Sequence, residues 1–380
     1  MGISRREWIA STMALPILAG AQEAVTIPGK RGMLVHNDRP EDLETPVEYL
    51  NTWLTPNDVF FVRQHLPRPR TNRDSHRVAL GGRVNKETTL SIAELERLPQ
   101  YTVAATLECT GNARGFFRPR VPGIQWGRGA IGNAEWIGPR LSDVLKLAGA
   151  DGNAPWVTVN GADVGVAKTP DFIRSLRMEK AMHPATLVAL KMNGEPLPEL
   201  HGGPARLVTP GWDGTSWVKW VTSFEVANEA DAGFFMNPAY RFPKHPGPPG
   251  AAANPADLEI IEAMPVKSYI TSPSEGERIG LAEATLQGIA WAGEQRVERV
   301  EVSCDGGRRW KDARLSEKNL PFAWRLWRLE WTPPQVGYFT ILSRATDSAG
   351  NVQPIAATWN PSGYLYNAID QVGVTVEKTA

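Results

Sequence analysis

The sequence predicts an α+β domain followed by a β-sandwich of immunoglobulin type. With 380 residues, the chain exceeds what one hydrophobic core usually supports, so two domains are expected. Residues 37–242 mix short β-rich runs with short helical ones, whereas the later β-rich runs follow one another at short intervals with no convincing helix between them. A tract rich in proline and glycine, Pro243–Pro255, separates the two patterns.

The first domain is expected over residues 25–243. Its β-rich runs are 78–84, 103–107, 156–159, 205–208 and 217–226. Leu90–Leu98 carries apolar residues at helical spacing, with Ser91 as a plausible N-cap, and Leu141–Ala148 repeats this pattern. Strands interspersed with short helices indicate the α+β class.

A linker is expected over residues 244–256, because a packed helix or strand would not tolerate its prolines and glycines. The second domain then covers residues 257–380, and its β-rich runs are 267–271, 284–291, 297–303, 323–330 and 338–346. The Asp305-Gly306-Gly307 and Ala349-Gly350-Asn351 segments supply glycine where a turn needs a positive φ. This spacing favours a sandwich of immunoglobulin type.

The amino-acid composition excludes several classes of partner and of stabilising bond. Lysine plus arginine and aspartate plus glutamate number 41 each, so the overall field favours neither nucleic acid nor an anionic membrane. The two cysteines, Cys109 and Cys304, lie far apart in dissimilar segments, which does not indicate a disulfide framework. Beyond the N-terminus no apolar run approaches the ~20 residues of a membrane helix, so no membrane insertion of the mature protein is expected.

The N-terminus has the pattern of an export signal. Ser4-Arg5-Arg6-Glu7-Trp8-Ile9 places two arginines before the apolar stretch Ile9–Leu18, and Ala19-Gly20-Ala21 follows as a small-residue cleavage site. Residues 1–24 are therefore predicted to be a twin-arginine signal region, and the protein to be periplasmic or otherwise exported. The alternative is an amphipathic N-terminal helix.

Cys109 lies where a β-rich run breaks into a turn. In Thr106–Gly115 the cysteine is followed by glycine and asparagine, and Arg114 lies five residues on. A thiolate there would be reachable by solvent and near positive charge, as a soft metal ligand requires. The alternative is a small buried apolar side chain.

Two other segments offer groups that bind anions. Arg63 and His65 alternate along an extended stretch and share one face. Glu199–Gly211 combines glycines with His201 and Arg206, and Lys219 follows.

No phosphate loop of the GxxxxGK[ST] type, no GxGxxG fingerprint and no paired zinc-ligand spacing occurs, which argues against ATP, nicotinamide nucleotides and zinc. Hydrolysis by a cysteine–histidine pair stays open, but it would leave the cationic residues without a role.

Five strings in order resemble the sulfite oxidase family of molybdopterin enzymes, and the likeness covers nearly the whole chain after the signal region. They are FFVRQH at Phe60–His65, ECTGNAR at Glu108–Arg114, MNGEPLPELHGGPARLVTPG at Met192–Gly211, VKW at Val218–Trp220 and WNPSGYLYN at Trp359–Asn367. The resemblance implies a sulfite oxidase-type molybdopterin-binding domain followed by a dimerising β-sandwich.

The resemblance also implies the site. Cys109 would be the protein's thiolate ligand to molybdenum, and Arg63 and Arg114 would act with it in catalysis by orienting an anionic substrate. The residues implied in holding molybdenum–molybdopterin are Phe61, Val62, Arg63, Gln64, His65, Asp163, His201, Arg206, Trp217, Val218 and Lys219. The implied reaction is oxidation of sulfite to sulfate, with two electrons passing to an external acceptor.

That acceptor is expected to be a separate protein such as a c-type cytochrome, because the sequence has no CxxCH haem motif and no haem is predicted. The sandwich is expected to form a homodimer interface. Its tryptophans would supply contacts there or, alternatively, pack within their own sandwich; they are Trp291, Trp310, Trp324, Trp327 and Trp331.

Two positions depart from the family pattern. Leu190 stands where the resemblance leads us to expect a substrate-facing tyrosine, and Ser362 replaces an arginine of the Trp-Asn motif. These changes indicate weaker sulfite binding, another sulfur substrate, or compensation by neighbours, for which the candidates are Arg118, Arg120 and Trp126. The Trp-Asn-Pro-x-Gly-Tyr string is also similar to enzymes of the sulfane dehydrogenase type, and a non-catalytic molybdopterin-fold binding protein is a further alternative.

Overall fold

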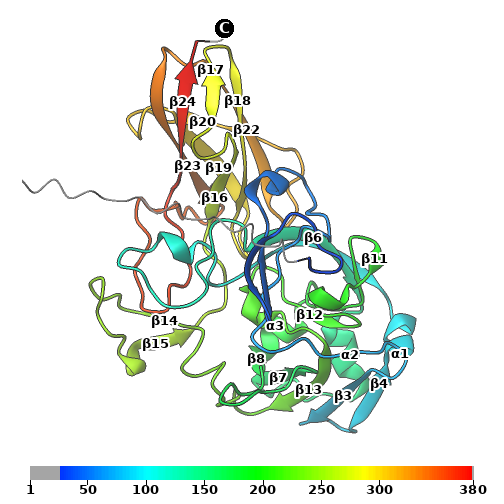
Figure 1. Cartoon of the computed structure of the whole chain (residues 1–380). Helices are drawn as coiled ribbons and strands as arrows, with labels where there is room; N and C mark the ends of the chain where they lie inside the picture. The colour runs from blue at the N-terminus through cyan, green and yellow to red at the C-terminus, as the bar shows by residue number, and fades with distance from the viewer. Residues whose placement is uncertain (1–25, 379–380) are drawn as a thin grey trace, which may run out of the picture.

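The computed structural model describes residues 26–378 and shows an α+β domain with a β-sandwich stacked on it (Figure 1). The C-terminal strand runs to the far end of the sandwich. The predicted signal region, residues 1–24, lies outside the described residues. No helix within 26–378 has the length and apolar character needed to cross a membrane.

The first domain contains short strands and three short α-helices. The strands are β1 Leu34–Asp38, β2 Glu41–Glu44, β3 Arg77–Gly82, β4 Thr88–Ser91, β5 Tyr101–Glu108, β6 Ile131–Gly138, β7 Trp156–Gly161, β8 Arg174–Arg177, β9 Leu187–Ala189, β10 Lys191–Met192, β11 Glu195–Pro196, β12 Arg206–Val208 and β13 Val221–Ala227. The helices are α1 Ile92–Arg97, α2 Leu141–Leu147 and α3 Met178–Met182. The predicted α+β class is confirmed.

A five-stranded sheet in the order β4-β3-β13-β7-β8 anchors this domain. Strand β13 runs parallel to β3 and antiparallel to β7. The predicted N-cap of α1 is confirmed: Ser91 accepts a hydrogen bond from the Glu94 amide, and the Glu94 carboxylate accepts one from the Ser91 amide, which satisfies two backbone donors at the helix start. Leu95 of α1 then packs into the core formed on the sheet.

The predicted β-run 217–226 is wrong in its first half. Strand β13 begins only at Val221, because residues 214–216 form a 3-10 turn and Trp220 has a φ of 49°. A backbone with positive φ cannot continue a strand ladder. The residues before Val221 are thereby free to turn their side chains into a cavity.

A second sheet of the first domain, β11-β10-β6-β5, carries Cys109 at its edge. Strands β5 and β6 pair antiparallel from Tyr101↔Gly138 to Glu108↔Ile131. The ladder ends at Glu108, so the next residue, Cys109, enters a turn, as the sequence predicts.

The second domain is a sandwich of two sheets, β16-β18-β22-β21 and β17-β24-β23-β19-β20. Its strands, preceded by the ribbon β14 Arg241–Pro243 and β15 Leu258–Ile260, are β16 Lys267–Ser272, β17 Arg278–Gly280, β18 Ala284–Trp291, β19 Val297–Ser303, β20 Lys311–Asp312, β21 Arg314–Leu315, β22 Arg325–Trp331, β23 Gly337–Asp347 and β24 Asp370–Glu377. The predicted linker lies largely in the loop between β14 and β15.

Four of the five sandwich tryptophans are buried within the chain itself, which favours the alternative of packing within one chain over dimer contacts; they are Trp291, Trp324, Trp327 and Trp331. Trp327 and Trp331 fill the core between the two sheets. Trp291 and Trp324 instead belong to a cluster that also contains Leu50 and Ile131 of the first domain. The two domains therefore share a hydrophobic interface.

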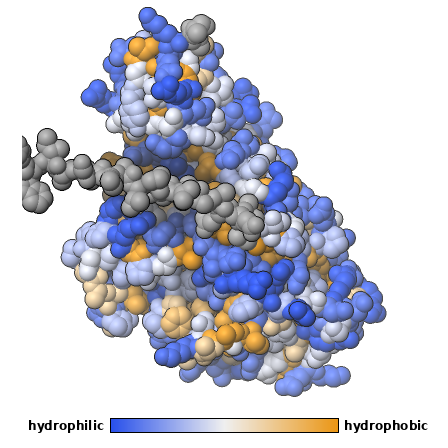
Figure 2. Space-filling view, in the orientation of Figure 1, coloured by the Kyte–Doolittle hydropathy of each residue, from blue (hydrophilic) through white to orange (hydrophobic). Residues whose placement is uncertain are grey.

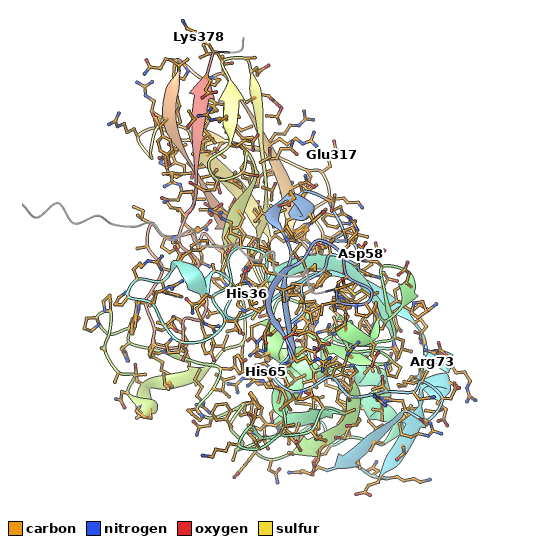
Figure 3. The ribbon with its side chains drawn as sticks, in the orientation of Figure 1. His36, Asp58, His65, Arg73, Glu317 and Lys378 are labelled. Atoms are coloured by element: carbon orange, nitrogen blue, oxygen red, sulfur yellow. The ribbon has the colours of Figure 1, made fainter. Side chains whose placement is uncertain are left out.

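Polar side chains cover most of the face drawn in Figure 2, and apolar ones lie there in small separate groups. In Figure 3 His65 lies inside the first domain, whereas Arg73 and Glu317 lie at its periphery and in the sandwich, respectively. His65 lines a cavity inside this domain.

Candidate active site

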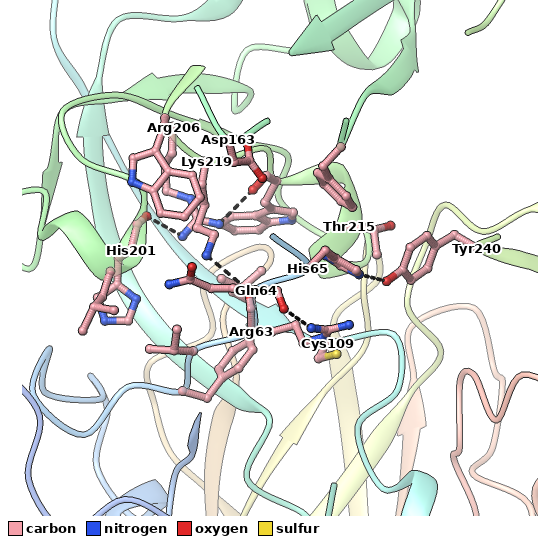
Figure 4. Close-up of a pocket in the computed structure, with 18 residues that line it drawn as sticks. Arg63, Gln64, His65, Cys109, Asp163, His201, Arg206, Thr215, Lys219 and Tyr240 are labelled. Carbon is pink, nitrogen blue, oxygen red and sulfur yellow. Dashed lines mark hydrogen bonds between the residues drawn. The ribbon is translucent and has the colours of Figure 1, made fainter. Parts of the chain in front are cut away.

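A cavity in the first domain brings together segments that are far apart in the sequence (Figure 4). The space between its lining residues is about 670 Å³, including the part that is open to solvent. Its lining residues are Phe61, Val62, Arg63, Gln64, His65, Leu107, Cys109, Asp163, Phe172, Leu200, His201, Arg206, Gly214, Thr215, Trp217, Lys219, Trp220 and Tyr240.

Every predicted site residue except Val218 and Arg114 lines this cavity. Val218 is buried in the main core, and its carbonyl accepts a hydrogen bond from the Leu207 amide at 2.8 Å. Successive side chains of an extended segment point to opposite sides, so Trp217 and Lys219 face the cavity while Val218 faces the core. The part predicted for Val218 in holding a cofactor therefore stays a prediction, since only the side chains of its neighbours Trp217 and Lys219 line the cavity.

The stretch 61–65 is fixed on both sides. Val62 exchanges backbone hydrogen bonds with Leu43, each 2.9 Å long. The Arg63 guanidinium donates to the Asp42 carboxylate at 3.0 Å, and burial raises the pKa of Asp42 while Arg63 opposes the rise. All five residues of the segment line the cavity, and their backbone is held in place by these hydrogen bonds.

Buried polar atoms without partners show what the cavity can accept. Gln64 is 2% exposed, and within the described part of the chain neither its amide nitrogen nor its amide oxygen has a hydrogen-bond partner. The Nε of Arg206 is likewise unpaired, although its other nitrogens donate to the carbonyls of His201 and Trp217. Buried polar groups are normally satisfied, and a heterocycle with both donor and acceptor edges, such as a pterin, would satisfy them.

The cavity is lined by more cationic side chains, Arg63, Arg206 and Lys219, than acidic ones. Burial lowers the pKa of Lys219 to about 7, with Arg206 adding to the fall and Asp163 opposing it. Burial also lowers the pKa of Arg206 to about 9. The Lys219 ammonium donates to the Arg63 carbonyl at 3.1 Å, so these cations converge on one region. A bound dianion such as a phosphate group would offset the cost of burying them.

Both cavity histidines are held neutral. Burial lowers the pKa of His65 and His201 well below the ordinary value, and nearby cations add to the effect. His65 stacks on Phe172, with ring centroids 4.6 Å apart, and its Nε2 is hydrogen-bonded to the Tyr240 hydroxyl. The Nε2 of His201 lies 2.7 Å from the Lys30 ammonium. Lys30 was not predicted, because it lies outside the five strings that resemble the sulfite oxidase family.

Cys109 occupies the turn after β5. Its amide donates to the Ala130 carbonyl at 2.9 Å, and its carbonyl accepts from the Asn112 amide at 2.8 Å. Burial raises the pKa of the half-buried thiol, while Arg63, Arg114 and the Gly111 amide lower it. A soft cation bound to the sulfur would displace its proton, so Cys109 has the chemistry and the place to serve as a metal ligand.

Arg114 does not line the cavity, and the catalytic role predicted for it stays a prediction. Its guanidinium donates to the carbonyls of Ser362 and Ile124, both at 3.1 Å, and lies 5.4 Å from the centre of the Tyr364 ring. Ser362 and Tyr364 belong to a loop that descends from the sandwich onto the first domain (Figure 1). Arg114 therefore influences the Cys109 thiol through its charge and ties this loop in place.

Leu190, which stands where a substrate-facing tyrosine was expected, does not reach the cavity. Leu190 is buried in the main core, where its amide donates to Ile137 at 2.8 Å, and it does not line the cavity. Another tyrosine, Tyr240, lines the cavity. Its ring stacks on Tyr364, with ring centroids 5.2 Å apart. The candidate compensating residues do not line the cavity either: Arg118 and Arg120 are exposed, and Trp126 is fully buried in the cluster behind the lining residues Phe61, Leu107 and Trp217.

The lining residues missed by the sequence analysis are Leu107, Phe172, Leu200, Gly214, Thr215, Trp220 and Tyr240. Several adjoin recognised strings, and proximity alone could have suggested them. Tyr240 had no such signal, because it lies in an irregular stretch directly before the short strand β14 and has a φ of 55°.

Comparison with known proteins agrees with this geometry. Residues 65–235 match the family described as "Oxidoreductase molybdopterin binding domain", and residues 258–377 match "Mo-co oxidoreductase dimerisation domain". The second match coincides with β15 to β24. The domain bounds predicted between these matches stay a prediction.

Curated relatives include sulfite oxidases of animals and plants. The mitochondrial enzyme of Macaca fascicularis is 37% identical over 90% of this chain, which spans 65% of the relative's length. The Gallus gallus sulfite oxidase is 37% identical over 90% of this chain and 77% of its own length. The Arabidopsis thaliana enzyme is 33% identical over 92% of this chain and 96% of its own length.

A solved structure covers both domains. The sulfane dehydrogenase SoxCD from Paracoccus pantotrophus aligns over 95% of each chain with a TM-score of 0.78 and 29% identity. Three findings agree on the family: both domains match family models, relatives are similar over most of the chain, and one solved structure is similar over 95% of it. The chain belongs to the sulfite oxidase family of molybdopterin-dependent oxidoreductases.

Proposed function

We propose that the chain binds molybdenum–molybdopterin in the Cys109 cavity and oxidises sulfite to sulfate, passing two electrons to an external acceptor such as a c-type cytochrome. The observation that carries the proposal is the pairing, in one cavity, of a reachable thiol with the unsatisfied amide of Gln64 and a cluster of buried cations. Each feature matches one part of the cofactor: the metal, the pterin and the phosphate.

The chain's residues would divide the work as follows. Oxygen transfer and the two-electron change belong to the molybdenum group when it is bound. Cys109 would ligate the metal, Gln64 and Arg206 would hold the pterin edges, and Arg206 with Lys219 would bind the phosphate. Arg63 lies near both the thiol and the cavity, where its charge would attract and orient an anionic substrate.

Tyr240 adds a neutral donor to this set. Burial raises the pKa of its phenol far above the ordinary value, so the hydroxyl keeps its proton at physiological pH. The neutral His65 imidazole beside it can exchange the hydrogen bond for one to a ligand. We expect the phenol to hydrogen-bond an oxyanion at the metal.

A second candidate is oxidation of a sulfane sulfur carried on another molecule. Two observations favour it: Ser362 stands in the Trp359–Tyr364 string where an arginine was expected, and the whole fold resembles the sulfane dehydrogenase SoxCD. One cation fewer near Arg114 would weaken the field that attracts free sulfite. Loss of turnover, leaving a molybdopterin-binding protein, is the remaining alternative.

We also propose that the sandwich forms a homodimer and that the protein is exported. The match of residues 258–377 to a dimerisation domain supports the first proposal. The Arg5-Arg6 pair before an apolar stretch supports the second. Retention of an Arg5→Lys/Arg6→Lys variant in the cytoplasm, with wild-type protein in the periplasm, is the expected result of a fractionation experiment.

The decisive experiment uses protein purified from a molybdenum-replete host. Molybdenum and pterin content are measured first, followed by reduction of ferricyanide and cytochrome c with either sulfite or a persulfide-bearing peptide as donor. Turnover with sulfite supports the first function, and turnover with the persulfide alone supports the second. Bound molybdenum with neither activity indicates a binding role, and absence of molybdenum contradicts the proposal.

A further inference from the structure

The residue before Cys109 carries a buried carboxylate whose charged partner comes from the other domain. Glu108 is 2% exposed and its Oε1 lies 2.6 Å from the Nζ of Lys267, which is 1% exposed. The indole of Trp291 donates to Oε2 of Glu108 at 2.9 Å. Lys267 begins β16 and lies directly opposite Trp291 of β18 in the sandwich ladder. One edge of the sandwich therefore supplies both donors.

The same carboxylate is part of the turn that holds Cys109. The Asn112 side-chain amide donates to Glu108 Oε1 at 3.0 Å and accepts from the Ala130 amide at 3.1 Å. The Asn112 backbone amide closes the turn onto the Cys109 carbonyl at 2.8 Å. Glu108, Asn112 and the backbone on either side of Cys109 thus form one hydrogen-bonded unit, and such a satisfied buried network is rigid.

We propose that Lys267 is a positioning residue for the Cys109 thiol: the sandwich domain, through the Lys267–Glu108 pair, sets the orientation of the turn that presents the sulfur to the cavity. The ammonium compensates the buried carboxylate, and without it Glu108 would be an unpaired charge that turns toward water. Because Asn112 joins Glu108 to the turn, that movement would carry Cys109 with it. The ligand role of the thiol rests on the proposed function, but its positioning does not.

The chain offers a matched control elsewhere between the same domains. The Lys180 ammonium of α3 contacts Glu294 of the sandwich and the Pro210 carbonyl, both at 2.7 Å. Lys180 is 4% exposed, so its removal also deletes a buried cation that joins the two domains. Glu294 and Pro210 lie outside the Cys109 turn, so this variant separates an effect on domain docking from an effect on the thiol.

The test compares Lys267→Met and Lys180→Met in the full-length chain, both in a Cys304→Ser background so that Cys109 is the one thiol. In cofactor-free protein the rate of alkylation of Cys109 by iodoacetamide is measured. In molybdenum-loaded protein the EPR g values of the one-electron-reduced metal are recorded. We expect Lys267→Met to change the alkylation rate several-fold and to shift the g values, and Lys180→Met to leave both at the wild-type values.

Wild-type behaviour of Lys267→Met, or an equal change in both variants, would overturn the proposal. Should Lys267→Met fail to fold, the double variant Glu108→Gln/Lys267→Met leaves no unpaired buried charge and keeps an amide oxygen for Trp291 and Asn112. Because no unpaired charge remains to turn toward water and the hydrogen bonds from Trp291 and Asn112 can persist, this variant is expected to fold and to be alkylated at the wild-type rate, and an altered rate would overturn the proposal. Failure of the wild-type protein to take up molybdenum would contradict the proposed function alone, because the alkylation comparison needs no metal.

Discussion

At the scale of single residues, the proposed metal site depends on one atom, the sulfur of Cys109. Cys109→Ser replaces a soft ligand by a hard one in the same space. We expect the loss of sulfite oxidation to exceed about 100-fold, since changes to groups that merely support a metal ligand already cost about 10–100-fold. Pterin content should persist, because Gln64, Arg206 and Lys219 are untouched.

The control is Cys304→Ser, since Cys304 lies at the edge of the sandwich core. Activity and pterin content are measured on both variants by the ferricyanide assay and by fluorescence of the oxidised pterin. Full activity of Cys109→Ser would exclude the thiol as the metal ligand.

Tyr240 allows a second substitution of one atom. Tyr240→Phe removes the hydroxyl bonded to His65 but keeps the ring stacked on Tyr364. We expect kcat/KM for sulfite to fall about 10-fold or more, the effect of one lost hydrogen bond of about 1–3 kcal/mol, with molybdenum content unchanged. An unchanged kcat/KM at full metal loading would show that the phenol does not contact the substrate.

Residue-level prediction succeeded where short strings carry the site and failed where the fold brings single residues in. Gln64, His201 and Arg206 lie in such strings and all face the cavity. Tyr240 and Lys30 reach the site or its rim from irregular segments, where neither periodicity nor spacing marks a side chain. A position in a string also does not reveal which side of the backbone a side chain takes: Leu190, at the position of the expected tyrosine, lies in the main core.

At the scale of elements, local signals determined most of the correct predictions. The N-cap of α1 is an example, because Ser91 and Glu94 satisfy each other's backbone amides within one turn. We expect Ser91→Ala to lower the free energy of unfolding by about 1 kcal/mol, measured by urea denaturation, with activity preserved. Ser75→Ala, at an exposed serine outside any helix start, is the control and should have little effect.

Several very short elements were not predicted. Strand β1 exists through its pairing with β2, and α3 has a single turn between β8 and β9. The start of β13 was misjudged because the run Trp217–Trp220 has strand-like composition but a backbone that turns to line the cavity. Tertiary demands of the site outweigh local preference there.

At the scale of the whole molecule, the two domains are one functional unit. The loop carrying Ser362 descends from the sandwich to Arg114, while Lys267 reaches from it to Glu108, on opposite sides of the Cys109 turn in sequence. The sequence predicted two domains and their classes, but it could not reveal that buried ion pairs and a shared aromatic cluster would join them.

The free energy of unfolding of the cofactor-free protein should depend on pH, because the empty cavity buries amines. The Lys219 amine has an ordinary pKa of 10.5, and the folded protein lowers it to about 7. Between these values the unfolded chain binds more protons than the folded one, so the free energy of unfolding of cofactor-free protein should rise with pH from about 7 toward 10.5 and reach its minimum below 7. Lys30, with a pKa also lowered to about 7, contributes in the same direction.

Lys219→Met should therefore flatten the rise of Tm between pH 7 and pH 9.5, measured by differential scanning fluorimetry on cofactor-free protein. Lys30, Lys180 and Arg206, whose pKa values burial also lowers, contribute to the slope that remains. Lys146→Met, at an exposed lysine of α2, should keep the wild-type slope. Loading with the phosphate-bearing cofactor should flatten the wild-type curve in the same way, because a bound dianion favours the charged amine and returns its pKa toward 10.5. Equal slopes for wild-type and Lys219→Met protein would mean that the Lys219 amine stays charged in the empty cavity, and the anion site would then have to be assigned to Arg206 and Arg63.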